Sequence, residues 1–247
     1  MKTNRIYRGD AVELMAEFPD ESFDLAFCDP PYNLEKAYNA HEDDMDREQY
    51  LAWCEEWLAE YVRLLKPEGS LVVVNIPEWA LEHAHYLNRH LQFREWISWD
   101  AMSVPRGYMM PAHYAVLHYS KATGDLEVND LPDPQPREWC LRPDCRERQR
   151  ELTKRNPLTD VWTHIHRIKH EGQRDDHPCQ LPLELLESLL ALLTDPGDLV
   201  IDCMIGTGTT AVAAKRLGRE YVGIDVDPSY VALARRKVRE ATPEAAR

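Results

Sequence analysis

The sequence predicts an α/β protein with a mostly parallel, twisted sheet covered by helices on both faces. Short apolar runs such as Phe23–Cys28, Ser70–Ile76 and Leu199–Cys203 alternate with segments whose apolar residues recur every three or four positions. Strands that alternate with amphipathic helices are typical of a parallel sheet buried on both faces. With 247 residues, 44% of them apolar, the chain can form one substantial core, so we expect one domain over residues 1–247.

Local patterns place the individual elements along the chain. Continuous or alternating apolar residues indicate strands, and apolar residues at spacings of three and four indicate helices. In chain order we expect strand Arg5–Tyr7, helix Ala11–Phe18, strand Phe23–Cys28, helix Arg47–Leu65, strand Ser70–Ile76, helix Glu78–His90, strands Glu95–Trp99 and His113–His118, helix Leu183–Leu193, strand Leu199–Cys203, a helix after Thr210 to Leu217, strand Tyr221–Ile224 and helix Pro228–Arg239.

Proline and glycine signals bound several of these elements. The Lys66-Pro67-Glu68-Gly69 turn should end the helix that starts at Arg47, because both residue types are unfavourable inside helices. Pro182 is a good first residue for the leucine-rich helix, and Gly218 should end the helix before the last strand. Over residues 121–176 the periodicity fades and prolines accumulate, which predicts an inserted, loop-rich segment.

The distribution of charge limits the kinds of partner. A formal net charge of −14 argues against a polyanion, because cationic contacts to phosphate dominate affinity for nucleic acid. The segment Arg137–Arg174 is an exception, with ten lysines and arginines against six acidic residues. An acidic protein with one basic segment can still bind DNA through that segment.

Apolar runs and cysteines bear on where the protein resides. The longest apolar runs fall short of the ~18–20 residues of a membrane helix, and the start lacks the apolar region of a signal peptide, so we expect a cytoplasmic protein with reduced cysteines. Cys140-x4-Cys145 followed by His166-x3-His170 has a spacing compatible with zinc. Ten histidines and six cysteines make such spacings common by chance, so no metal is predicted and zinc stays an alternative.

A glycine-containing segment between a strand and a helix indicates a cofactor loop. Asp202-Cys-Met-Ile-Gly206-Thr-Gly208-Thr-Thr210 places small residues where backbone amides can approach a ligand. Taken alone, this segment could equally be a tight turn. Asp225, however, closes the next strand about 20 residues later, where a carboxylate can accept hydrogen bonds from a ribose diol. The two features together predict a cofactor that contains adenosine.

Three motifs carry a resemblance to a known family. Cys28-Asp-Pro-Pro-Tyr-Asn33 looks like the D-P-P-Y signature of amino-group methyltransferases, and the segment Asp202–Thr210 resembles their cofactor loop D-P-F-x-G-S-G-T-T. His177-Pro-Cys-Gln-Leu-Pro182 resembles H-P-T-Q-K-P, which precedes that loop in the circularly permuted beta group of DNA methyltransferases. The order of the motifs also matches, and the resemblance spans about residues 5–240.

This resemblance implies a circularly permuted Rossmann-like fold, S-adenosylmethionine as cofactor and double-stranded DNA as substrate. The strand Arg5–Tyr7 should then lie beside the helix Pro228–Arg239. The methyl group would go to an exocyclic amine of a flipped base, and adenine N6 is favoured over cytosine N4 because Asp29 precedes Pro-Pro-Tyr. The alternatives are an RNA or protein-glutamine methyltransferase, and a catalytically silent DNA-binding regulator.

The resemblance also implies site residues. The catalytic residues would be Asp29, Pro30, Pro31 and Tyr32. The cofactor-binding residues would be Asp10, Asp29, His177, Gln180, Asp202, Gly206, Thr207, Gly208, Thr209, Thr210 and Asp225. Leu181 stands where the family has a lysine that can pair with the methionine carboxylate, so the group that neutralises this carboxylate stays open, with Thr209, Thr210 and nearby amides as candidates. Asp10 could equally be a helix cap.

The Asp-Pro-Pro-Tyr segment suits amine chemistry. An exocyclic amine is a poor nucleophile because its lone pair is delocalised into the ring. Hydrogen bonds from this amine to Asp29 and to the Pro30 carbonyl would favour a pyramidal nitrogen whose lone pair points at the methyl sulfonium. Tyr32 would stack on the flipped base. A proline-stiffened turn is the alternative for this segment alone.

The basic segment lies where the resembled group carries its target-recognition insertion, so its cations are the expected DNA contacts. These are Arg142, Arg146, Arg148, Lys154, Arg155, Arg167 and Lys169. So short an insertion predicts a short recognition site or help from a second subunit, and a homodimer and a cognate restriction endonuclease are candidate partners. Four tryptophans are expected in the core or in an oligomer contact: Trp53, Trp57, Trp96 and Trp99.

Overall fold

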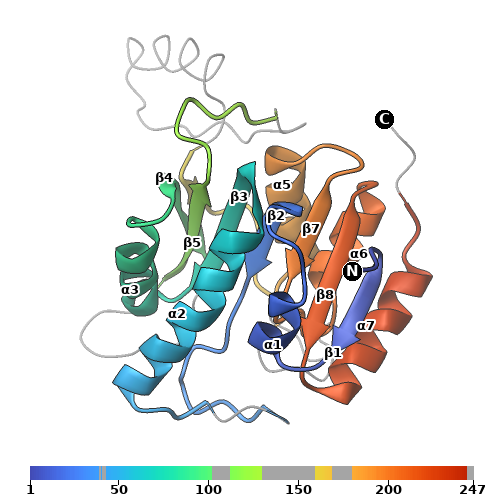
Figure 1. Cartoon of the computed structure of the whole chain (residues 1–247), viewed down its shortest axis with the longest axis horizontal. Coiled ribbons are helices and arrows are strands. Elements are labelled where there is room, and N and C mark those ends of the chain that lie inside the picture. Colours follow the sequence, from blue (N-terminus) through green and yellow to red (C-terminus); the bar gives the residue numbers. More distant parts are fainter. Residues whose placement is uncertain (39, 41–42, 102–111, 130–158, 169–179, 244–247) are drawn as a thin grey trace.

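A computed structural model of the chain describes residues 1–38, 40, 43–101, 112–129, 159–168 and 180–243. Figure 1 shows a central sheet with helices on both sides. The strands are β1 Arg5–Arg8, β2 Phe23–Cys28, β3 Leu65–Asn75, β4 Gln92–Asp100, β5 His113–Ser120, β6 Val161–Trp162, β7 Leu199–Asp202 and β8 Glu220–Asp225. The helices are α1 Ala11–Ala16, α2 Arg47–Leu64, α3 Pro77–Leu87, α5 Leu183–Leu193, α6 Thr209–Arg216 and α7 Pro228–Glu240.

The described strands form one sheet in the order β1-β8-β7-β2-β3-β5-β4-β6. Within it β5 is antiparallel to both of its neighbours, and the other adjacent pairs are parallel. The mostly parallel sheet predicted from the sequence is therefore confirmed. At the centre β2 lies between β3 and β7, with Phe27 opposite Asp202. The strand before Asp-Pro-Pro-Tyr and the strand before the glycine-containing loop are thus direct neighbours.

The first strand lies beside the last helix, as the motif order predicts. β1 occupies an outer edge of the sheet and pairs with β8. The guanidinium of Arg235 on α7 donates to the carbonyl oxygen of Ile6 from Nε at 3.1 Å and from Nη2 at 2.6 Å. In space the chain therefore continues from α7 to β1 as though an ordinary Rossmann-like chain had been opened between them.

Both faces of the sheet are buried because its central strands are apolar on both sides. Along β2, Ala26 and Cys28 contribute to the core beneath α1, α2 and α3, whereas Leu25 and Phe27 contribute to the core beneath α5, α6 and α7. All four side chains are at most 2% exposed. Burial of each large one contributes about 1.5–3 kcal/mol, which explains why the run is continuously apolar rather than alternating.

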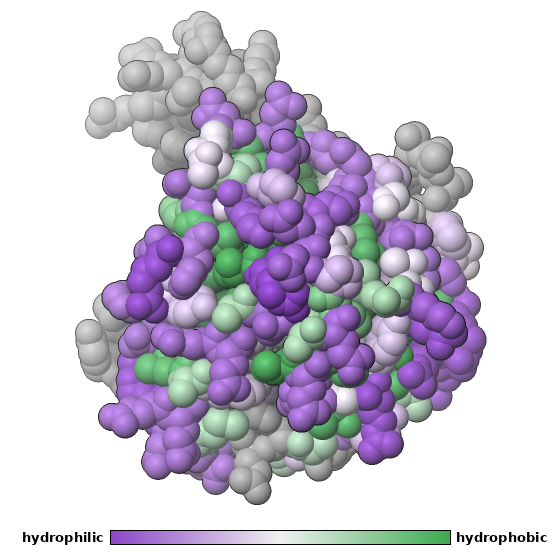
Figure 2. Space-filling view, viewed as in Figure 1, coloured by the Kyte–Doolittle hydropathy of each residue, from purple (hydrophilic) through white to green (hydrophobic). Residues whose placement is uncertain are grey.

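The surface is mainly polar where the structure describes it. Figure 2 shows mostly hydrophilic residues on one face, with the hydrophobic ones in small separate areas. The exposed large hydrophobic residues among those described are Met1, Leu81, Phe93, Val128 and Val226. Among the described helices, none is long and apolar enough to cross a membrane.

One expectation about the elements is wrong. The turn expected over Lys66–Gly69 is part of β3, which begins at Leu65, directly after α2. The pairing of β3 with β2 shifts register there, and an added Cβ on Gly69 would lie 2.9 Å from the carbonyl oxygen of Phe23. Proline and glycine therefore mark an irregularity in the strand pairing, where residues 66–69 of β3 stand against Asp24 of β2, rather than a turn.

A short strand lies within the segment expected to be loop-rich. Val161 and Trp162 form β6, which pairs with the edge strand β4 opposite Ser98 and Trp99. Two residues are too few to show the alternation that identifies a strand. The expected helix ends also shift: α1 ends at Ala16 and α3 at Leu87, since each helix closes through a short turn rather than continuing.

We predict that the contact between α6 and α7 makes Gly208 irreplaceable. Gly208 has φ +89°, and an added Cβ would lie 2.7 Å from the Cβ of Ala234. Gly197 has φ +96° with no atom within 4 Å of an added Cβ, so it serves as the control for backbone strain alone. In urea denaturation, Gly208→Ala should lower the free energy of unfolding by about 1–3 kcal/mol more than Gly197→Ala. Equal losses would contradict the close packing.

Candidate functional site

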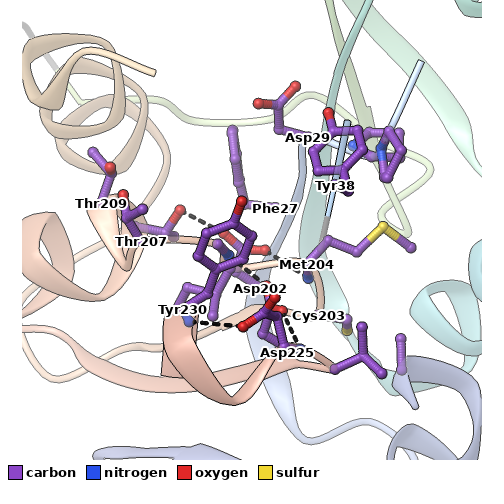
Figure 3. Close-up of a pocket in the computed structure, with 18 of the residues that line it drawn as sticks. Phe27, Asp29, Tyr38, Asp202, Cys203, Met204, Thr207, Thr209, Asp225 and Tyr230 are labelled. Carbon is purple, nitrogen blue, oxygen red and sulfur yellow. Dashed lines mark hydrogen bonds between the residues drawn. The ribbon is translucent and has the colours of Figure 1, made fainter. Parts of the chain in front are cut away.

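The ends of four parallel strands enclose one pocket. The chain leaves β1 at Gly9-Asp10, β2 at Asp29, β7 at Asp202 and β8 at Asp225, all at the carboxyl edge of the sheet, where ligands of such folds bind. In Figure 3, Asp29 lies at one end of this pocket and Asp225 at the other, with Met204 and Tyr230 between them. The described lining residues are Gly9, Asp10, Ala11, Phe27, Asp29, Pro30, Pro31, Tyr32, Tyr38, Ala40, Trp53, Gln180, Leu181, Leu186, Asp202–Thr207, Thr209, Thr210, Asp225–Asp227 and Tyr230.

The side chain of Asp202 determines the conformation of the glycine-containing loop. Its buried carboxylate accepts a hydrogen bond from the Met204 amide at 3.0 Å and from the Thr210 hydroxyl at 2.6 Å. These two bonds close the turn between β7 and α6. Gly208, in the left-handed region, then starts α6. The side chain of Asp202 therefore organises the loop. The amides of Ile205 and Gly208 also donate within the protein, to the carbonyls of Ile224 and Ile205, so these bonds fix the loop further.

Asp225 joins this loop to the next strand. One carboxylate oxygen accepts from the Gly206 amide at 2.8 Å, and the other accepts from the Asp227 amide at 2.8 Å. Asp227 in turn caps α7 by accepting from the Ser229 amide at 2.6 Å. Each Asp225 oxygen keeps a second lone pair for a ligand hydroxyl, which is the arrangement that ribose recognition requires.

Asp29 and Tyr32 form a pair at the other end of the pocket. The Tyr32 hydroxyl donates to one oxygen of Asp29 at 2.5 Å, and no other described residue donates to this carboxylate. Burial raises the pKa of Asp29 from 3.8 to about 7, the Tyr32 hydrogen bond opposes this rise, and the charge of Asp202 adds to it. The second oxygen of Asp29 remains available to accept from a ligand donor.

The pocket is rich in carboxylates. It contains Asp10, Asp29, Asp202, Asp225 and Asp227, and none of its described lining residues is a lysine or an arginine. Burial, opposed by the bonds from Thr210 and Met204, raises the pKa of Asp202 to about 7, and burial also raises the pKa of Asp225. Such a concentration of negative charge favours a ligand that carries positive charge.

Most of the predicted site residues meet at this pocket. Those that line it are Asp10, Asp29, Pro30, Pro31, Tyr32, Gln180, Asp202, Gly206, Thr207, Thr209, Thr210 and Asp225. Gly208 lies behind the loop against Ala234. Asp10 also caps α1, since its side chain accepts from the Glu13 amide at 3.1 Å, so the helix cap is confirmed and its contact with a cofactor stays a prediction.

Other predicted residues are away from the pocket or outside the described residues. Arg167 is half-buried just after β6 and does not line the pocket. The predicted residues outside the described ranges are Arg142, Arg146, Arg148, Lys154, Arg155, Lys169 and His177. Of the four residues with zinc-compatible spacing, only His166 is described, and the described part of the chain contains no cluster that could hold a metal ion.

Sequence reasoning missed several aromatic lining residues. Trp53 packs against the core as expected and also lines the pocket, which was not expected; Trp96 packs against the core, and Trp57 and Trp99 are buried. Tyr38 and Tyr230 also line the pocket. The sequence could have indicated Tyr230 as a lining residue. It lies in the first turn of α7, which follows directly after Asp225 at the end of β8.

The fold and the pocket define a Rossmann-like protein that binds a nucleotide-containing cofactor. Residues 23–236 match the DNA methylase family, which covers amino-methyltransferases of the N6 and N4 types. The chain belongs to this family.

Individual relatives agree with this assignment. Type II methyltransferase M.BamHI of Bacillus amyloliquefaciens is 35% identical over 90% of this chain, which spans only about half, 54%, of that relative. Type II methyltransferase M1.MboII of Moraxella bovis is 27% identical over 94% of this chain and 95% of its own length. The crystal structure of a putative DNA modification methylase from Thermus thermophilus, complexed with S-adenosyl-L-methionine, is 26% identical, with a TM-score of 0.68 over 98% of this chain and 99% of that one.

We predict that Asp29 makes the ligand-free protein less stable as the pH rises. The folded-state pKa, about 7, lies above the ordinary value of 3.8, so this contribution is complete below about pH 4 and is lost as the pH rises through 7. Chemical denaturation between pH 4 and pH 8 should show a smaller fall in the free energy of unfolding for Asp29→Asn than for the wild type. The difference should approach about 1.4 kcal/mol for each unit of pKa shift. Parallel curves would contradict the assignment.

Proposed function

We propose that this protein transfers a methyl group from S-adenosylmethionine to an exocyclic amine of a flipped base in double-stranded DNA. One observation carries the proposal: a single pocket joins the loop Gly206–Thr210 and Asp225 to the segment Asp29–Tyr32. The loop and Asp225 suit an adenosine-containing cofactor, and the segment Asp29–Tyr32 suits an amine. The match to the DNA methylase family and the cofactor bound to the Thermus thermophilus relative support the same assignment.

The cofactor would occupy the Asp225 end and the centre of the pocket. Asp225 would accept from the ribose hydroxyls, and the amides of the loop would approach the methionine part. The carboxylates around the pocket suit the sulfonium charge. Leu181 lines the pocket and no described lining residue is cationic, so the Thr209 hydroxyl and nearby amides are the proposed partners of the methionine carboxylate, because the Thr210 hydroxyl already donates to Asp202.

The target amine would lie at the Asp29 end. The free oxygen of Asp29 and the carbonyl of Pro30 would accept its two hydrogens, which directs the nitrogen lone pair at the methyl group. The new N–C bond forms as the S–C bond breaks in line, S-adenosylhomocysteine leaves, and the amine proton is lost to Asp29 or to water. Tyr32, whose ring is 5.8 Å from that of Tyr114, would stack on the base.

The proposal also specifies which base receives the methyl group. Adenine N6 is favoured over cytosine N4 because an aspartate precedes Pro-Pro-Tyr. The family includes both specificities. A silent DNA-binding regulator is the alternative of a different class, and the pocket opposes it, because Asp29, Tyr32 and Asp225 are all in place.

Variants at the two ends of the pocket should separate chemistry from cofactor binding. Asp29→Ala should bind S-adenosylmethionine normally and lose methyl transfer by about 100-fold or more, because its hydrogen bonds act mainly while the nitrogen attacks. Asp225→Ala should weaken cofactor binding by about ten-fold or more, the equivalent of a lost hydrogen bond to a charged group. Calorimetry gives the affinities, and nucleoside analysis of the DNA product gives the rate and the base. Near-normal turnover by Asp29→Ala would refute its role.

We also propose that residues 121–176 recognise the DNA target. Two residues of this range are attached to the catalytic fold: Asn129 donates to the carbonyls of Ala191 and Thr194 at the end of α5, and the carbonyl of Ile165 accepts from Trp99 of β4. Such attachment would hold a recognition segment near the sheet edge. The proposed partners are double-stranded DNA, a second copy of the chain and, by analogy with the Type II relatives, a restriction endonuclease.

Salt dependence of DNA binding tests this segment. Reversing the charges of Arg142, Arg146 and Arg148 should reduce the affinity for all sequences and lower the salt slope by about one unit per lost phosphate contact. Reversing the three exposed or half-exposed cations Arg5, Arg8 and Arg236, at the far edge of the sheet, provides a control of equal charge. If both triple variants behave alike, the segment is not the DNA-binding surface.

A further inference from the structure

Two aromatic side chains hold the backbone of the Asp29–Tyr32 segment from the side of α2 and α3. The Tyr50 hydroxyl donates to the carbonyl oxygen of Pro31 at 2.7 Å, and Nε1 of Trp79 donates to the carbonyl oxygen of Tyr32 at 2.7 Å. Tyr50 is 1% exposed and Trp79 is 6% exposed, and their ring centroids are 4.6 Å apart. Neither residue lines the pocket, so both act on the segment from behind.

The segment needs such external anchors because of its prolines. Pro30 and Pro31 have no backbone N–H, so the middle of this stretch cannot be fixed by donating to a neighbouring strand or turn. At the two prolines, the carbonyl groups are the backbone groups that can still form hydrogen bonds. Tyr50 and Trp79 bind two successive carbonyls, whereas no described residue donates to the carbonyl of Pro30. The protein thus satisfies two acceptors and leaves the third for another donor.

The anchors are themselves held in place. The guanidinium of Arg47 lies 5.0 Å from the centre of the Trp79 ring and pairs with Glu78 at 3.0 Å and with Glu82. Trp53 packs beside Tyr50 with ring centroids 5.8 Å apart. Because these contacts hold both donors in place, the loss of either hydrogen bond would move the catalytic segment and not the donor.

We propose that Tyr50 and Trp79 are positioning residues for methyl transfer, and this inference rests on the proposed function. Their two hydrogen bonds set the rotation of the Pro31 and Tyr32 peptide groups. That rotation aims the Pro30 carbonyl and the Asp29 carboxylate at the target amine. Misplacement of reacting groups by a fraction of an ångström lowers the rate of transfer while ground-state binding is retained.

Removal of a single donor tests the inference. Tyr50→Phe and Trp79→Phe keep an aromatic ring and lose the hydrogen bond to the segment. Tyr119→Phe is the matched control, because this equally buried tyrosine donates at 2.9 Å to Asn88, which does not line the pocket. Methyl transfer to DNA, cofactor affinity without DNA and the unfolding temperature are measured for each variant.

We expect kcat to fall about ten-fold in Tyr50→Phe and in Trp79→Phe, the rate equivalent of one hydrogen bond, with KM for DNA and the cofactor Kd within about two-fold of wild type. Tyr119→Phe should keep its kcat while its unfolding temperature falls as much as that of Tyr50→Phe. The Tyr50→Phe/Trp79→Phe double variant should lose less than the product of the single effects, because both donors act on one segment.

Three results would overturn the inference. One is an unchanged kcat in Tyr50→Phe beside an active wild type, which leaves the proposed function intact. Another is an equal loss of kcat in Tyr119→Phe, which would show that lost stability is the cause. The third is a wild type that binds S-adenosylmethionine and methylates no DNA amine, which would remove the proposed function and the inference together.

Discussion

The register between β2 and β7 is the constraint on which the rest of the structure depends. Phe27 lies opposite Asp202 in this parallel pair, so the segment that starts at Asp29 and the loop that starts at Cys203 leave the sheet side by side. A shift by one residue would turn every side chain of β2 to the opposite face and separate the two loops. The two buried cores on either side of the sheet keep this register, because both faces of β2 are apolar.

Carboxylates have two roles around the pocket. Asp202 and Asp225 accept hydrogen bonds from backbone amides and a hydroxyl of the loop, so they determine the path of the chain. The same groups, together with Asp29, are buried with raised pKa values, which shows that their surroundings in the protein oppose their ionisation. A ligand with positive charge would relieve this opposition. The organisation of the loop and its preference for a cationic ligand therefore have a common physical origin.

The sequence predicts the elements that carry strong periodicity and the residues that carry motifs. The leucine-rich helix α5 has the predicted bounds, because its apolar residues follow a helical period between Pro182 and a turn. The irregular pairing at Lys66–Gly69 was not predictable, because proline and glycine signal a turn as well as an irregularity within a strand. Tyr50, Trp53 and Trp79 carry no motif, and their places at the site depend on how α2 and α3 pack in three dimensions.

Tyr61 of α2 explains how the order of the two functional halves along the chain can vary. Its buried hydroxyl donates to the carbonyl of Phe27 at 2.9 Å and accepts from the amide of Cys203 at 3.0 Å. The strand ends that lead to the two loops are thus bridged by one side chain and by the β2–β7 ladder, not by a covalent connection between them. Joining the old termini of a chain and opening it at an internal loop leaves this bridge undisturbed, so the site does not depend on the order in which its two halves are synthesised.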